Sequence, residues 1–327
     1  MTQYSITHRP RRLRTTQAMR NLVAENHLHA ENLILPLFVK EGATTPTPIK
    51  NMKGVVQHTF DSLHAEVERA LSLGVGGIMV FAIPQKRDEA GSEAINPNGI
   101  LHQAVTKIRE QVGERLIVIA DLCLDEFTSH GHCGVLAEDG SVDNDATLEI
   151  YGQMAVTLAQ AGAHMLGLSG MMDGQVGFVR NALDDAGFNN TSLLAYAEKY
   201  ASAFYGPFRD AVDSQLKGDR KSYQQDPSNL KDAMREIALD VEEGADIIMV
   251  KPGMMYLDVV QAASQFVDLP IASYIISGEM AMIEAASDAG AIDRERAILE
   301  VLMAAKRAGA SIICTYWAIE VAEMLRK

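Results

Sequence analysis

Two lysines end apolar segments, where a lysine is unexpected. Lys251 follows the apolar run 247–250 and precedes Pro252 and Gly253, and Lys199 ends the segment 192–199. A buried ammonium is costly, so such a lysine tends to lose its proton and become a nucleophilic amine. A lysine that marks a strand end in solvent is the alternative. If both side chains enter one cavity, their mutual repulsion lowers at least one pKa, and two carbonyl substrates can be held as Schiff bases.

The loop after the third apolar segment carries candidate metal ligands. Cys123, Asp125 and Cys133 offer two thiolates and a carboxylate, with His130 and His132 nearby. Three protein ligands leave a fourth position for water or substrate, as in catalytic zinc sites. The carboxylate keeps magnesium open as an alternative, and Cys123 also fits a small buried hydrophobic residue.

A long basic segment, residues 200–227, follows Lys199. It carries Arg209, Arg220 and Gln224 in a chain whose formal net charge is -14. A long basic loop over a barrel mouth is typical of a lid that clamps an anionic substrate, because arginine binds carboxylates in a bidentate manner. A solvated charged loop is the alternative.

Composition excludes several classes of protein. The 327 residues are 47% hydrophobic and 22% charged, which supplies a large globular core. The acidic balance disfavours a nucleic-acid partner, whose phosphates the chain would repel. No apolar run approaches the roughly 20 residues of a membrane helix, and no signal-peptide core is present, so a cytoplasmic location is expected. Three cysteines argue against a disulfide framework.

Short apolar segments alternate with helical patterns along the chain. Eight segments have strand character: 33–39, 77–83, 116–123, 164–169, 192–199, 246–251, 270–277 and 311–317. Seven stretches have apolar residues at helical spacing: 62–73, 100–112, 146–161, 176–186, 229–243, 257–266 and 294–308. This alternation predicts an α/β protein with a closed (β/α)8 TIM barrel, and a doubly wound open sheet is the runner-up. The simplest division is an N-terminal arm, residues 1–30, and a catalytic barrel, residues 31–327.

In a barrel of this kind the chemistry lies at the carboxyl ends of the strands. Polar side chains stand at six of the predicted strand ends: Asp121 and Cys123, Ser169, Lys199, Lys251, Ser277 and Tyr316. Each alone fits a solvated strand end. Their convergence from six separate segments favours a functional site.

Eight longer motifs, spread from the N-terminal arm to the C-terminus, carry a resemblance to a known family. They are RPRRLR (9–14), TSHGHCG (128–134), DNDATLE (143–149), MDGQV (172–176), KYASAFYGPFRDA (199–211), GDRKSYQ (218–224), MVKPGMMYLD (249–258) and SGEMAMI (277–283). In sequence and in order they resemble the delta-aminolevulinic acid dehydratases, also called porphobilinogen synthases.

The resemblance implies a homo-oligomeric, usually octameric, (β/α)8-barrel enzyme of tetrapyrrole and heme biosynthesis. Such an enzyme condenses two molecules of 5-aminolevulinate, with loss of two waters, into porphobilinogen. By the same resemblance Lys251 holds the substrate that becomes the propionate side of the product, and Lys199 holds the acetate-side substrate. Asp121 matches an acidic residue beside the lysines that shuttles protons.

Further roles are implied for residues that bind the substrates. Arg209, Arg220 and Gln224 match the family's clamp on the acetate-side substrate. Ser277 and Tyr316 match its binding of the other carboxylate.

Two implied sites are remote from the chemistry. Glu236 matches a carboxylate at a second, allosteric magnesium site between subunits. The arm, with Arg11 and Arg12, matches a segment that embraces a neighbouring subunit.

The metal loop departs from the family pattern. Zinc-dependent members carry three cysteines there, whereas this chain has Asp125 between Cys123 and Cys133. Two thiolates with a carboxylate still favour zinc. The third cysteine, Cys314, lies within an apolar segment and is expected in the core.

Two other functions fit parts of this pattern. A class I aldolase shares the Schiff-base lysine but needs neither a second lysine nor a thiolate loop. A ligand-binding barrel without catalysis is disfavoured because the set of polar strand ends is complete.

Overall fold

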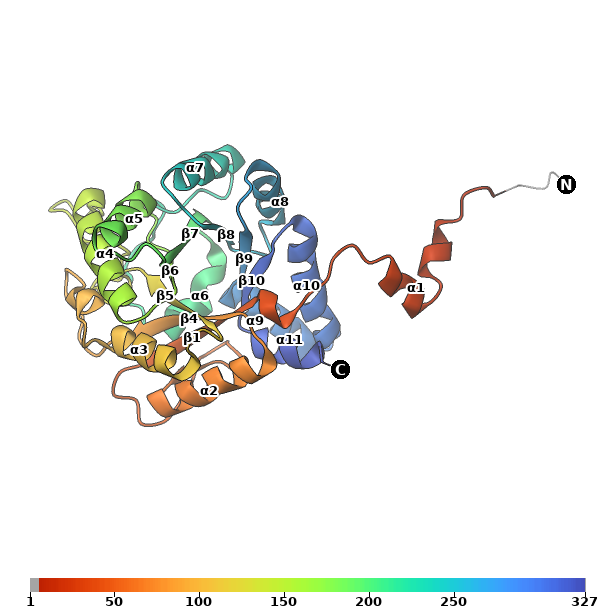
Figure 1. Ribbon diagram of the computed structural model, residues 1–327, viewed down its shortest axis with the longest axis horizontal. Helices are drawn as coiled ribbons and strands as arrows, with labels where there is room; N and C mark the ends of the chain where they lie inside the picture. The colour runs from red at the N-terminus through yellow and green to blue at the C-terminus, as the bar shows by residue number, and fades with distance from the viewer. Residues whose placement is uncertain (1–5, 327) are drawn as a thin grey trace.

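Eight parallel strands close into a barrel in the computed structural model, which describes residues 6–326 (Figure 1). The strands are β1 (Leu33–Lys40), β4 (Gly77–Ile83), β5 (Ile117–Leu122), β6 (Met165–Leu168), β7 (Ser192–Lys199), β8 (Ile247–Lys251), β9 (Ile271–Ile275) and β10 (Ile312–Thr315). Each strand pairs with the next along the chain, and β10 pairs with β1 through Ile34 and Cys314. The predicted barrel is therefore confirmed, and the open sheet is wrong.

Helices surround the ring of strands (Figure 1). They are α2 (Phe60–Leu73), α3 (Ile100–Val112), α4 (Asn144–Gln160), α5 (Gln175–Asp185), α7 (Leu230–Glu242), α8 (Leu257–Phe266), α9 (Ser277–Asp288), α10 (Arg294–Ala308) and α11 (Ala318–Met324). The side chains of Thr59, Asp143 and Asp293 accept backbone hydrogen bonds at the starts of α2, α4 and α10. Gly74 and Gly309 end α2 and α10 in the left-handed conformation that glycine adopts most easily.

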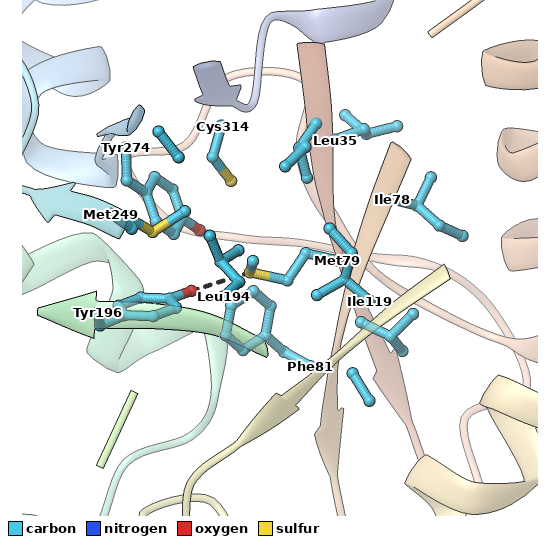
Figure 2. Packing of buried hydrophobic residues seen from close by; sticks show 14 of the residues in the cluster. Leu35, Ile78, Met79, Phe81, Ile119, Leu194, Tyr196, Met249, Tyr274 and Cys314 are labelled. Carbon is cyan, nitrogen blue, oxygen red and sulfur yellow. Dashed lines mark hydrogen bonds between the residues drawn. The ribbon is translucent and has the colours of Figure 1, made fainter. Parts of the chain in front are cut away.

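Side chains fill the interior of the barrel. Residues paired across parallel strands share a face of the sheet, so Met79 and Ile119 lie on one face, as do Leu194 and Ile247. The contact of the Tyr196 hydroxyl with Met79 Sδ across the barrel shows that Met79 points inward. Figure 2 shows Met79, Leu194, Met249 and Cys314 packed together, and all four are fully buried. The barrel below the mouth is thus a packed core, and any site must lie above it.

A bulge in β7 decides which way the two lysines face. Ala195 pairs with Ile248 and Glu198 with Val250, so β7 has one more residue than β8 between these pairs. Without the extra residue, strict alternation would place Glu198 inside the barrel and Lys199 outside. The bulge inverts this order: Lys199 turns inward beside its partner Lys251, and Glu198 turns outward toward α7.

Short elements complete the chain. A small hairpin of β2 (Thr47–Pro48) and β3 (Val56–His58) extends the sheet beside β1. The predicted lid, residues 200–227, contains a 3-10 turn (Ala203–Tyr205) and α6 (Gly206–Ala211). Among the described residues, no helix combines the length and apolar character needed to cross a bilayer.

The N-terminal segment extends away from the barrel (Figure 1). It contains a 3-10 turn (Pro10–Arg14) and α1 (Gln17–Leu22), and neither element has a buried residue. Arg11 and Arg12 are exposed in the turn, and the side chain of Leu22 is 80% exposed. Residues 1–5 of the predicted arm lie outside the described part of the chain, as does Lys327.

Candidate active site

A small enclosed cavity lies at the carboxyl ends of the strands, under the predicted lid. Its volume is about 30 Å³. Seven predicted site residues line it: Asp121, Asp125, Lys199, Arg209, Arg220, Gln224 and Lys251. Because a cavity of this size holds only one or two waters, the covering segment must move before a larger ligand can enter.

The two lysines are direct neighbours in this cavity. Lys199 and Lys251 pair across β7 and β8, and they are only 5% and 4% exposed. The Nζ atom of Lys251 lies 4.5 to 5.6 Å from the ring centres of Tyr205, Phe208 and Tyr274. The lysines are thus held in one largely dry site.

The two amines differ in pKa because their surroundings differ. Burial lowers the pKa of Lys251 to about 8, and the charge on Lys199 adds to this effect. For Lys199 burial acts in the same direction, but the nearby Cys133, Cys123 and Asp125 outweigh it and raise its pKa above the ordinary value. Lys251 is therefore the amine that is more easily made neutral and nucleophilic.

A chain of hydrogen bonds joins Lys199 to Asp121. Lys199 donates to the backbone oxygen of Ser169 at 2.6 Å, and the Ser169 hydroxyl donates to Asp121 Oδ2 at 3.0 Å. Burial raises the pKa of Asp121 to about 7, against the opposing pull of both lysines. A carboxyl group with this surrounding can hold a proton beside the amines.

The predicted metal ligands converge. One ligand atom from each of Cys123, Asp125 and Cys133 lies within 4.8 Å of the other two, and all three residues are buried. A hydrogen bond from Cys123 lowers the pKa of Cys133 to about 6, against the effect of burial. The Tyr151 hydroxyl donates to the backbone oxygen of Cys133 and lies 3.9 Å from Cys123 Sγ. Two thiols and a carboxylate in this arrangement fit a zinc ion with one open position.

Arg220 connects the lid to the metal loop. Its Nη2 donates to Asp125 Oδ2 and to the Gly131 oxygen, both at 2.8 Å. Tyr223, from the same segment, lies with its hydroxyl 3.0 Å from His132 Nδ1. In this structure the predicted substrate clamp is therefore closed onto the loop of the candidate metal site.

Ser277 and Tyr316 do not line the cavity and lie just behind its wall. The Ser277 hydroxyl accepts a hydrogen bond from the Phe208 backbone N–H at 3.0 Å, which leaves its own proton free to donate. Tyr316 shares a hydrogen bond of 3.0 Å with Tyr274, one of the rings around Lys251. Neither residue is therefore part of the cavity lining in this structure.

Glu236 belongs to a different cavity, of about 470 Å³, on the outer side of the barrel. Asp232, Glu236 and Asp240 of α7 line it together with the end of the lid. Burial raises the pKa of neighbouring Glu198 to about 10, and neither of its carboxylate oxygens has a hydrogen-bond partner among residues 6–326. Sequence reasoning missed Glu198, because only the bulge turns it to this side.

Sequence reasoning also missed the aromatic residues of the active site. Tyr196, Tyr205, Phe208 and Tyr274 all have ring centres within 6 Å of the Lys251 amine. Two of them stand in the motif KYASAFYGPFRDA, so the dense aromatic residues there were an available signal.

Together, the closed (β/α)8 barrel and the paired buried lysines beside a thiol-rich loop define an enzyme of the barrel class. Residues 7–324 match the family model described as delta-aminolevulinic acid dehydratase. The chain belongs to this family of lyases.

Relatives that carry the name delta-aminolevulinic acid dehydratase match the chain over nearly its whole length. The Streptomyces coelicolor protein is 58% identical over 320 residues, which is 97% of each chain. The Mycobacterium tuberculosis protein is 54% identical over 319 residues, also 97% of each. The crystal structure of the Toxoplasma gondii enzyme, solved with its reaction product porphobilinogen, has a TM-score of 0.94 and 43% identity, covering 98% of this chain and 92% of that one.

Proposed function

We propose that this chain condenses two molecules of 5-aminolevulinate into porphobilinogen with loss of two waters, through Schiff bases on Lys199 and Lys251. The observation that carries the proposal is the register of β7 and β8, which sets both amines side by side in one buried cavity. The porphobilinogen bound to the Toxoplasma gondii relative supports the same product here.

The chain's own residues account for the covalent steps. The lone pair of a neutral Lys251 amine attacks the ketone carbon, the C–N bond forms, and the carbonyl oxygen leaves as water. The resulting iminium withdraws electrons, so an adjacent carbon loses a proton and becomes a nucleophile toward the second substrate. Lys199 holds that second substrate in the same way, and holding both removes much of the entropy of a two-substrate reaction. Asp121, bonded to Ser169, is placed to take up and return protons.

Cys123, Asp125 and Cys133 would hold the metal of this family member. Their two sulfur donors favour zinc over magnesium, which prefers oxygen ligands in octahedral geometry. A bound zinc ion supplies Lewis-acid chemistry, polarising a carbonyl group or activating a water beside the lysines.

One assay tests the function as a whole. Porphobilinogen formation from 5-aminolevulinate is measured before and after treatment with a chelator, then after adding zinc or magnesium. Borohydride trapping with 5-aminolevulinate and with a panel of sugars separates this activity from that of an aldolase. An adduct with 5-aminolevulinate but no porphobilinogen under any metal condition would indicate a binding barrel instead.

Arg209, Arg220 and Gln224 form the clamp on the acetate-side carboxylate in this proposal. Arg220 must then give up its hydrogen bond to Asp125 and bind the substrate carboxylate instead when the lid opens and closes. We expect Arg220→Ala to raise KM by about 10- to 100-fold, the range for losing a hydrogen bond to a charged group. Steady-state kinetics measure this, with Lys217→Ala on the same segment as control. An unchanged KM in Arg220→Ala would remove this residue from the clamp.

Ser277 and Tyr316 bind the propionate-side carboxylate in the same proposal. The Ser277 hydroxyl is bonded to Phe208 of α6 and the Tyr316 hydroxyl to Tyr274, and both of these partners have rings beside the Lys251 amine. Because neither residue lines the small cavity, the segment over it must move before a substrate carboxylate can reach them. A complex with product in which neither hydroxyl touches a carboxylate contradicts this assignment.

Glu236 contributes to an allosteric magnesium site. The cavity beside α7 collects three carboxylates, and a divalent cation relieves the repulsion among them. Burial and neighbouring carboxylates raise the pKa of Glu236 and of Asp240. We expect Glu236→Gln to abolish activation by magnesium. Activity titrated with magnesium measures this, and Glu242→Gln, an exposed change on the same helix, is the control. Equal activation in both variants contradicts the assignment.

The arm, residues 1–30, packs against a neighbouring subunit of a homo-oligomer, which we take to be an octamer. Its turn and short helix bury nothing within one chain, and a segment with no core of its own needs a partner to be ordered. Sedimentation of the full chain checks the assembly, and a monomer at enzyme-assay concentrations would rule it out.

A further inference from the structure

Tyr196 lies close to both catalytic amines. Its ring centre is 5.8 Å from Lys199 Nζ and 5.1 Å from Lys251 Nζ. Among the aromatic side chains of residues 6–326, Tyr205, Phe208 and Tyr274 approach only Lys251 in this way. Tyr196 is 1% exposed, so the ring acts in a site where water does not screen it.

The fold holds this ring in a fixed position. Tyr196 lies within the irregular part of β7, between Ala195 and Glu198, and the extra residue there brings Lys199 to the inward side. The Tyr196 hydroxyl donates to Met79 Sδ across the barrel at 3.0 Å. Figure 2 marks this hydrogen bond with a dashed line. On the neighbouring strand, a Cβ atom at Gly167 would come within 3.3 Å of the ring, so this glycine leaves room for it.

The charges around the amines leave a need for such a group. Lys199 and Lys251 repel one another, and Asp121, Asp125 and Cys314 are the other titratable groups facing Lys251 from β5, its following loop and β10. Arg220 already pairs with Asp125. On the Lys199 side, Cys133, Cys123 and Asp125 favour the positive charge. Lys251 has burial and the charge of Lys199 against it, and Asp121 is the main group that offsets them.

We propose that Tyr196 is a positioning residue for both Schiff bases, its π face stabilising the positive charge on Lys199 and Lys251 when each becomes an iminium. The inference rests on the proposed function. As each iminium forms, the amine lone pair makes the C–N bond, oxygen leaves as water, and nitrogen keeps the positive charge. The ring itself forms and breaks no bond. The quadrupole of its π face attracts the positive charge on nitrogen.

Three variants test the role of the ring. Tyr196→Phe keeps the ring and loses the hydroxyl, and Tyr196→Leu loses the ring but stays apolar. Leu194→Ala, two residues along the same inward face, is the control for making a cavity in the barrel. Each is measured for porphobilinogen formation, for the fraction of enzyme trapped by borohydride with 5-aminolevulinate, and for melting temperature.

We expect Tyr196→Leu to lower kcat by about 10- to 30-fold, the scale of a desolvated cation–π contact, with KM changed less than 3-fold. The fraction of enzyme trapped by borohydride falls as well. The ring favours the charged form of the amines, so its loss lowers their pKa. The acid limb of the kcat/KM profile therefore moves to lower pH. Tyr196→Phe stays within about 3-fold of wild type. Leu194→Ala lowers the melting temperature without moving the acid limb.

Two results would overturn the proposal: wild-type kcat and trapping in Tyr196→Leu, or equal losses in Tyr196→Phe and Tyr196→Leu. If Tyr196→Leu does not fold, phenylalanines with one to three ring fluorines at position 196 weaken the quadrupole at nearly constant shape. Then log kcat must fall steadily with fluorine number, and a flat series rejects the inference. Failure of the wild type to form porphobilinogen rejects the proposed function instead.

Discussion

Lys251→Met is expected to abolish porphobilinogen formation, lowering kcat by about 10⁴-fold or more, as when the nucleophile of other covalent enzymes is removed. Methionine has a similar length and no amine, so no Schiff base can form at this position. The barrel is expected to keep its stability, because the change removes a buried ammonium and places a thioether among four aromatic rings. Turnover assays and thermal unfolding measure the two effects.

Lys199→Met is the matched change for this prediction. It too is expected to stop turnover, but borohydride should still trap one 5-aminolevulinate on Lys251. In Lys251→Met the trapped adduct at that position disappears. Porphobilinogen made at an appreciable rate by Lys251→Met would overturn the assignment of Lys251 while leaving the fold and family untouched.

The barrel was predictable from sequence because its strands are nearly continuous apolar runs. Seven of the eight predicted segments contain a whole barrel strand, and β1 runs one residue past the other segment. The seven predicted helical stretches agree with helices to within two residues at each end. Helix α9 was missed because its sequence, SGEMAMIEAASD, is only weakly amphipathic. Alanines and methionines are spread around the helix, so an apolar face does not stand out from a polar one. Helix α6 was missed because it is only six residues long within the lid.

Part of the candidate site could be predicted because residues at the carboxyl ends of parallel strands must meet. Lys199, Lys251 and Asp121 came together for that reason, and the loop after β5 brought Cys123 to Cys133. The bulge in β7 was not predictable from residue types, although it alone turns Lys199 inward and Glu198 outward. Strict alternation would have placed a carboxylate beside Lys251, so one inserted residue decides the chemistry of the site.

The lid adds a constraint that sequence could not supply. Arg220 belongs to the predicted clamp, yet it is bonded to Asp125, a predicted metal ligand. A carboxylate at this position can therefore serve the metal or the arginine, whereas a thiolate would bind arginine less well. If both proposed roles hold, Asp125 links the position of Arg220 to the charge of the loop that carries the candidate metal ligands.

Removing the metal is the second change expected to have a large effect. A chelator should reduce porphobilinogen formation to a few per cent or less, because the metal polarises a reacting group, and zinc should restore it. Magnesium is expected to restore far less, since the two thiolates bind it poorly. Full activity of metal-free protein, checked by elemental analysis, would contradict the assignment of this loop.

Variants of the cysteines locate the effect within the chain. Cys133→Ala should weaken zinc binding by at least about 100-fold, because losing one of three protein ligands removes a bond that orients the others. Cys314→Ala is the matched control, since Cys314 is equally buried but lies in β10 outside the ligand cluster. Competition titration with a chromophoric chelator gives the affinities, and cobalt substitution reports thiolate ligation through its absorption. Equal affinities in the two variants would place the zinc elsewhere, whereas a loss confined to Cys133→Ala ties the metal to the loop beside Lys199.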